Sequence, residues 1–108
     1  MLPIKPQPAP PEAPPGLSQR SLDLWAHFAP PGEKEAGRRA LLAEALRALD
    51  RADQARAMVD TDGLVSGGGG KIARAHPALR IERESRAAFA KLLQQLGLDQ
   101  DPALPWET

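Results

Sequence analysis

The positions of the twelve prolines constrain the fold of this 108-residue chain more than any other feature. Seven of them fall within the first fifteen residues. Because proline lacks an N–H and pushes the preceding residue toward extended backbone, we expect residues 1–16 to form a disordered or polyproline-II arm. This arm suits either a solvated leader or a ligand for a groove that binds proline-rich segments. The roughly ninety residues that remain can form one domain with a modest core.

The segment after the arm predicts a short helix over residues 18–28. Ser18 or Ser21 can cap its start by accepting a backbone N–H, and the Pro-Pro-Gly run at 30–32 stops it. Apolar residues one turn apart predict its buried face: Leu22, Trp25, and Phe28 or Ala29.

A proline-free segment over residues 33–59 predicts a long helix. Glu33 and Glu35 lie in its first turn, where carboxylates favour the positive end of the helix dipole. Its apolar face is broad and half alanine, which permits close helix approach. Such a helix is too long for the rest of the chain to cover, so we expect its central residues to pack in the core and also to line a contact between subunits. These residues are Leu42, Ala45, Leu46, Leu49 and Ala52.

Residues 60–75 interrupt the helical pattern, and residues 77–96 resume it. Asp62-Gly63 is a turn signal, and the following segment predicts a Gly-rich loop or a small β-hairpin. Pro77 suits the first position of a helix, and Gly97 is an expected helix stop. The predicted fold class is therefore all-α, with a short N-terminal helix and a long helical hairpin.

Four glycines and a lysine, at 67–71, resemble a phosphate-binding loop. That motif requires a serine or threonine after the lysine, whereas Ile72 follows Lys71, and no long apolar strand precedes the glycines. The chain has no cysteine, and His27 and His76 lie far apart, so no metal site is expected. No residue stands in a recognisable nucleophile setting. We therefore expect no cofactor and no enzymatic activity.

Charge is distributed unevenly although the formal net charge is zero. Residues 64–91 carry a net charge of +4, and residues 98–108 carry −3, which indicates different partners for the two segments. No apolar run is long enough to span a membrane, and no apolar core of a signal peptide follows the N-terminus. We therefore expect no membrane partner and a cytoplasmic location.

Two stretches together resemble the small terminase subunits of tailed phages. One is LDLWAHFAP at 22–30, and the other is AHPALRIERESRAAFAKLLQQLGL at 75–98. The similarity covers roughly residues 20–100, and the His-Pro helix that ends in Leu-Gly-Leu is its more specific part. Proteins of this type also occur in prophages and in gene transfer agents.

The resemblance implies a non-catalytic adaptor of a DNA-packaging motor. Small terminases form rings, commonly of about eight to twelve subunits. They bind double-stranded DNA and recruit and regulate the large terminase, which is the ATPase and nuclease, in the cytoplasm of the host cell. On this chain the implied DNA contacts are the cations Lys71, Arg74, Arg80, Arg83 and Arg86. Leu104 and Trp106, which we expect to be exposed in the acidic tail, are the implied motif for the large terminase.

Composition, charge and the resemblance together predict three parts: an arm at 1–16, a helical oligomerisation and DNA-binding domain at 17–98, and a tail at 99–108. Many small terminases begin with a helix-turn-helix, whereas this chain has one short helix at 18–28. Weak or sequence-tolerant phosphate contacts are therefore expected rather than specific readout of the major groove. The alternative is a helical regulatory protein that dimerises through its long helix and has no role in packaging.

Overall fold

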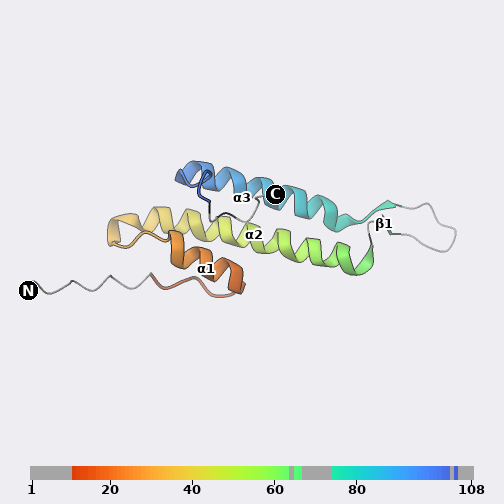
Figure 1. The fold of residues 1–108 in the computed structure, drawn as a ribbon, viewed down its shortest axis with the longest axis horizontal. Coiled ribbons are helices and arrows are strands. Elements are labelled where there is room, and N and C mark those ends of the chain that lie inside the picture. The colour runs from red at the N-terminus through yellow and green to blue at the C-terminus, as the bar shows by residue number, and fades with distance from the viewer. Residues whose placement is uncertain (1–10, 64, 67–73, 103, 105–108) are drawn as a thin grey trace, which may run out of the picture.

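A computed structural model describes residues 11–63, 65–66, 74–102 and 104 of the chain. Three helices dominate it, namely α1 (Gln19–Phe28), α2 (Ala36–Asp62) and α3 (Pro77–Leu96). A short 3₁₀ turn, η1 (Glu33–Glu35), precedes α2. Helices α2 and α3 pack along each other, and in Figure 1 α2 lies between α1 and α3. The predicted all-α class is confirmed.

The end of the α2–α3 pair carries two short strands. Strand β1 (Val65–Ser66) is antiparallel to β2 (Arg74–Ala75), with Val65 opposite Ala75 and Ser66 opposite Arg74. The tetraglycine run lies outside the described residues.

Helix α1 begins at a cap that the sequence offered as one of two choices. Ser18 is the cap, because its hydroxyl accepts the N–H of Ser21 at 3.2 Å. The predicted buried face of α1 is confirmed at Trp25, and Phe28 and Ala29 pack against the core, but Leu22 is 36% exposed, and Ser21 and Leu24 are buried instead. Ser21 faces α2, where its hydroxyl donates a hydrogen bond to Asp50.

Helix α2 ends three residues beyond the predicted limit at 59. Gly63 closes it with φ +91°, a conformation that L side chains rarely adopt, and its N–H binds the carbonyl oxygen of Val59 at 2.7 Å. The helix therefore runs until it meets a glycine that can leave the right-handed region.

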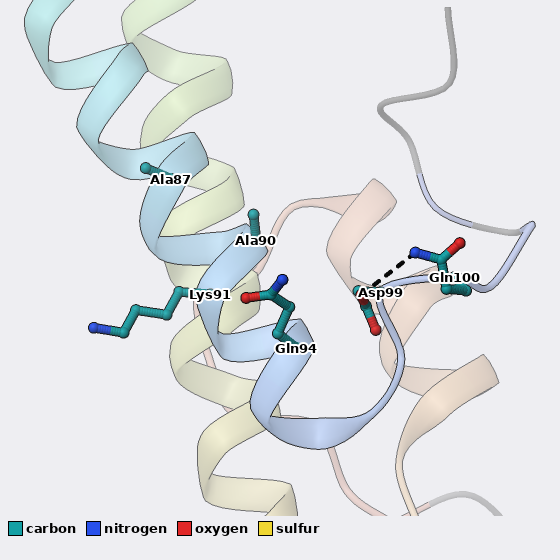
Figure 2. A pocket seen from close by; sticks show the side chains of 6 residues that line it. All are labelled: Ala87, Ala90, Lys91, Gln94, Asp99 and Gln100. Atoms are coloured by element: carbon teal, nitrogen blue, oxygen red, sulfur yellow. Dashed lines mark hydrogen bonds between the residues drawn. The ribbon is translucent and has the colours of Figure 1, made fainter.

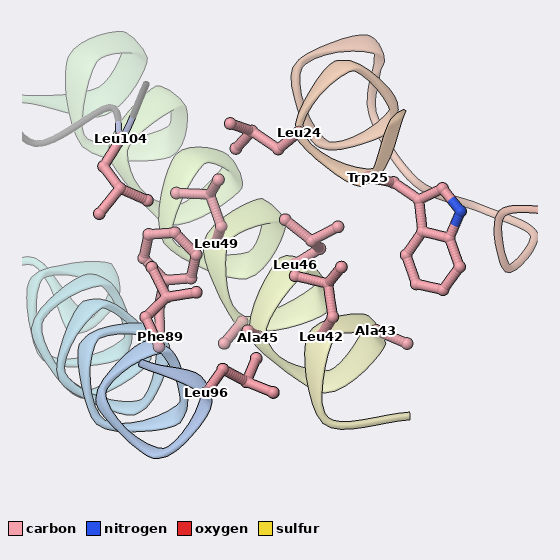
Figure 3. Packing of buried hydrophobic residues seen from close by; sticks show 12 residues of the cluster. Leu24, Trp25, Leu42, Ala43, Ala45, Leu46, Leu49, Phe89, Leu96 and Leu104 are labelled. Carbon is pink, nitrogen blue, oxygen red and sulfur yellow. The ribbon is translucent and has the colours of Figure 1, made fainter. Parts of the chain in front are cut away.

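The core lies between α2 and the two other helices. The five central residues of α2 are all at most 1% exposed within a single chain, and all of them except Ala52 belong to a cluster that includes Phe89 and Leu93 of α3 (Figure 3). This placement differs from the prediction that they also line a contact between subunits, because the chain's own helices already cover their side chains. The five are Leu42, Ala45, Leu46, Leu49 and Ala52.

Helix α3 spans the predicted residues, and its two ends have defined caps. His76 is the N-cap: its Nδ1 accepts the N–H of Ala78 at 3.0 Å, and its Nε2 lies 2.9 Å from Oδ2 of Asp62. Because Nδ1 is an acceptor, Nε2 carries the proton that is donated to Asp62. At the other end Gly97 adopts the left-handed conformation, and Leu98 turns back onto the carbonyl of Leu93 at 2.9 Å.

The described part of the N-terminal arm packs against the helices. Trp25 Nε1 donates to the carbonyl oxygen of Pro11 at 2.7 Å, and Ala13 and Leu17 contact the core. Pro11, Ala13 and Leu17 therefore attach this part of the chain to the packed helices, which differs from the solvated arm that the proline content predicts. Residues 1–10 lie outside the described part of the chain.

Candidate nucleic-acid interface

The five predicted DNA contacts fall in different settings. Lys71 lies outside the described residues, and the backbone of Arg74 belongs to β2. Arg80, Arg83 and Arg86 lie on α3, three residues apart, and therefore turn progressively around the helix. The three arginines consequently face different neighbours.

Arg80 is held by an acidic residue one turn along α3. Its Nε donates to Oε1 of Glu84 at 2.8 Å, and the pair is largely exposed. This hydrogen bond, followed by the negative charge of Glu84, raises the pKa of Arg80 above its ordinary value. An exposed pair of this kind is weak, so Arg80 can exchange Glu84 for a phosphate.

Arg86 belongs to an ion-pair network that joins the three helices. Its Nη2 lies 3.1 Å from Glu82 and 3.5 Å from Asp53 of α2. Asp53 also binds Arg20 of α1 at 2.9 Å, and Glu82 lies 3.6 Å from Arg56. Arg86 therefore contributes to the packing of α3, and a DNA phosphate would have to compete with two carboxylates for it.

Arg83 is exposed and forms no ion pair with the residues that the structure describes. Lys91, two turns further along α3, is also exposed. Of the predicted contacts on α3, Arg83 is therefore the one that is readily available to a polyanion.

Two arginines that the sequence analysis did not select lie on α2. Arg47 and Arg51 are one turn apart, and both line a cavity of about 250 Å³ next to the arm. Their spacing was visible in the sequence, but the nearby acidic residues indicated an ordinary solvated face. The fold places a chain turn beside them, which no local pattern could reveal.

A larger open cavity, of about 640 Å³, lies between α3 and the turn that follows it (Figure 2). Ala87 and Ala90 form its apolar part, and polar side chains surround them: Lys91, Gln94, Asp99 and Gln100. Asp99 accepts a 3.4 Å hydrogen bond from Gln100. The lining offers room for an apolar side chain, but its polar groups do not converge on one point.

Of the two residues in the predicted motif for the large terminase, the structure describes only Leu104. Leu104 is only 3% exposed and belongs to the same core cluster as Leu49 and Phe89 (Figure 3). Turns that join Asp101 to Leu98, and Leu104 to Asp101, bring the chain back over the helices. Leu104 therefore differs from the exposed anchor that was predicted, and Trp106 lies outside the described residues.

Within the described ranges no group of three or more His, Cys, Asp or Glu residues is arranged to hold a metal ion. In the same ranges, no helix combines the length and the apolar character that crossing a bilayer requires. Comparison of the chain with protein-family models, with curated proteins and with solved structures finds no significant match.

Proposed function

We propose that this chain is a small terminase subunit. It is a non-catalytic adaptor that oligomerises into a ring, binds double-stranded DNA weakly and with little sequence preference, and recruits and regulates the large terminase.

The observation that carries the proposal is where the two resembling stretches lie. Trp25, from the first stretch, is buried in the core. In the second stretch His76 and Pro77 begin α3, and the Leu-Gly-Leu run at 96–98 forms its C-terminal cap. Both stretches thus belong to one packed unit, which supports the view that together they carry the resemblance to small terminase subunits.

DNA binding in this proposal depends on exposed cations rather than on an inserted recognition helix. Arg83 and Lys91 are exposed on α3, and Arg80 is held there only by a surface pair. Contacts of this kind bind phosphates without reading bases, and a ring multiplies them. The affinity should therefore fall steeply as salt concentration rises.

Ring formation in this proposal uses apolar side chains that remain exposed in the single chain. Such residues lie on all three helices: Leu22, Leu41, Met58 and Ile81. Met58 and Ile81 are about half exposed, at 52% and 49%, so they offer the most apolar surface to a second subunit.

Native mass spectrometry of the full chain at micromolar concentration tests the ring. A closed oligomer larger than a dimer is expected, and Ile81→Glu should dissociate it, whereas Lys34→Glu, an exposed change in η1, should not. A monomer or dimer that leaves DNA unbound at low salt would instead favour the helical regulatory protein.

DNA binding and the partner enzyme are tested separately. Arg83→Glu should weaken binding to a DNA duplex at least about tenfold at low salt, and Lys34→Glu, the same charge change, should have a much smaller effect.

The assembled protein should alter the ATPase rate of the large terminase from the same genome. An unchanged rate in the presence of a ring that binds DNA would argue against the packaging role.

A further inference from the structure

The cavity beside the arm lies where the chain turns into α1 and passes over α2. Pro15 and Gly16 form one side of it, and three polar residues of α2 form much of the other: Arg47, Arg51 and Gln54, together with Asp50. Its volume is about 250 Å³, and it opens to solvent. It is large enough for a phosphate group with part of the molecule that carries it.

Two cations in this lining have unused hydrogen-bonding capacity. Arg47 and Arg51 are four residues apart, so their side chains leave α2 on the same face and repel each other. Arg47 uses Nη1 to bind Glu44 at 3.1 Å, and its other N–H groups are not involved in that bond. In the part of the chain that is described, Arg51 forms no ion pair.

Gln54 adds a neutral donor three residues beyond Arg51, on the same ridge of the helix. Its side-chain amide can donate two hydrogen bonds. Two guanidinium groups and an amide are a donor set that suits a tetrahedral oxyanion, which has acceptors in several directions.

The carboxylate of Asp50 also belongs to the lining, and it would repel an anion if its charge faced the cavity without compensation. Its oxygens are already occupied. Oδ2 accepts the N–H of Ser18 at 2.9 Å, and Oδ1 accepts the hydroxyls of Ser18 and Ser21, both at 2.6 Å. These three donors direct the carboxylate toward α1 and partly compensate its charge.

We infer that Arg47, Arg51 and Gln54 form a binding site for a phosphate group. A bound phosphate would accept hydrogen bonds from both guanidinium groups and relieve their mutual repulsion. The inference extends the proposed function, because it places a DNA-backbone contact on α2 in addition to the arginines of α3. The same chemistry would also accept inorganic phosphate or the phosphate of a free nucleotide.

The first experiment is an NMR titration of the full-length ¹⁵N-labelled chain with inorganic phosphate. The side-chain signals of Arg47, Arg51 and Gln54 should shift together and saturate with one dissociation constant. Arg51→Ala should weaken this binding about tenfold, because a hydrogen bond to a charged group is lost. Arg83→Ala, which removes the same charge from α3, should change it less than about twofold.

Arg51→Lys is a second variant that separates geometry from charge. It retains the cation but loses the planar pair of donors, so its affinity should lie between those of the native chain and Arg51→Ala. Because Arg51 is exposed, all three variants should unfold at nearly the native temperature. Equal phosphate binding by the native chain and Arg51→Ala, or shifts that map only to α3, would overturn the inference.

A second titration, with a short DNA duplex, identifies the source of the phosphate. Shifts at Arg47 and Gln54 that Arg51→Ala weakens about tenfold assign the site to the DNA backbone. If only inorganic phosphate shifts them, the site binds a free phosphate and the DNA contact on α2 is rejected. A chain that forms no ring and binds no DNA would defeat the proposed function, while the phosphate titration would still decide the site.

Discussion

Ser21 and Asp50 meet inside the core, where the hydroxyl of Ser21 donates a 2.6 Å hydrogen bond to Oδ1 of Asp50. The two residues are 29 positions apart in the sequence, and Ser21 has no exposed surface. Ser18 donates to the same carboxylate from both its N–H and its hydroxyl. One side chain of α2 thus holds the N-cap and the first turn of α1.

Replacing Asp50 should therefore loosen α1 as a unit. In Asp50→Asn one oxygen acceptor becomes an amide donor that faces the N–H or hydroxyl of Ser18, so we expect a loss of about 2 kcal/mol in the free energy of unfolding. Urea denaturation measures it. Asp60→Asn removes only an exposed pair with Arg56 and should cost less than about 0.5 kcal/mol, so equal losses would contradict the structural role of Asp50.

Leu104 should contribute to stability although it lies eight residues beyond the end of α3. Leu104→Ala removes a buried side chain from the cluster around Leu49 and Phe89, and should cost about 2 kcal/mol. Leu22→Ala, at a side chain that is 36% exposed, is the matched control and should cost less than about 1 kcal/mol. Thermal or urea unfolding measures both losses. An unchanged stability of Leu104→Ala would contradict the burial of Leu104 and favour its predicted role as an exposed anchor for a partner.

Alanine substitutions at Arg86 and Arg83 should affect different properties, namely stability at Arg86 and DNA binding at Arg83. Arg86→Ala leaves Glu82 and Asp53 without one of their cations and should lower the free energy of unfolding by about 1 kcal/mol, a modest value because the side chain is partly exposed. Arg83→Ala should change it by less than about 0.5 kcal/mol and affect DNA binding instead. Similar stabilities for the two variants would mean that the network contributes nothing.

Replacing glycine by alanine should lower the stability of the fold at Gly97 and raise it at Gly37. Gly97 has φ +73°, where a side chain is strained whatever the space, so Gly97→Ala should cost about 1 kcal/mol. Gly37 lies near the start of α2 without a positive φ, and an added Cβ would meet nothing within 4 Å. Gly37→Ala should therefore stabilise the chain by up to about 1 kcal/mol, and differential scanning calorimetry of the two variants tests the sign of each effect.

The prediction of the fold succeeded where local chemistry decides the structure. Pro77 and Gly97 delimit α3 at the predicted residues because a missing N–H and a left-handed φ act within one turn. The predicted C-terminal end of α2 was less accurate. The residues Asp60 to Asp62 are compatible with either a helix or a turn, and only Gly63 forces the helix to end.

The candidate site was predicted in part. The basic character of α3 is visible in the sequence, but which of its arginines is free depends on residues that fold against them. Arg86 is engaged because Asp53 of another helix lies 3.5 Å away, while Arg83 is exposed and forms no ion pair in the described part of the chain. The cavity beside Arg47 and Arg51 exists because the turn at Gly16 packs next to α2, and a contact over that sequence distance could not be predicted from local patterns.

The sequence by itself determined the helices and most of the apolar faces, because periodicity and capping act between neighbours in the chain. Tertiary structure alone decided the burial of Asp50 and Leu104 and the pairing of Arg86. Burial and pairing depend on distances between residues far apart in the sequence, and packing sets those distances.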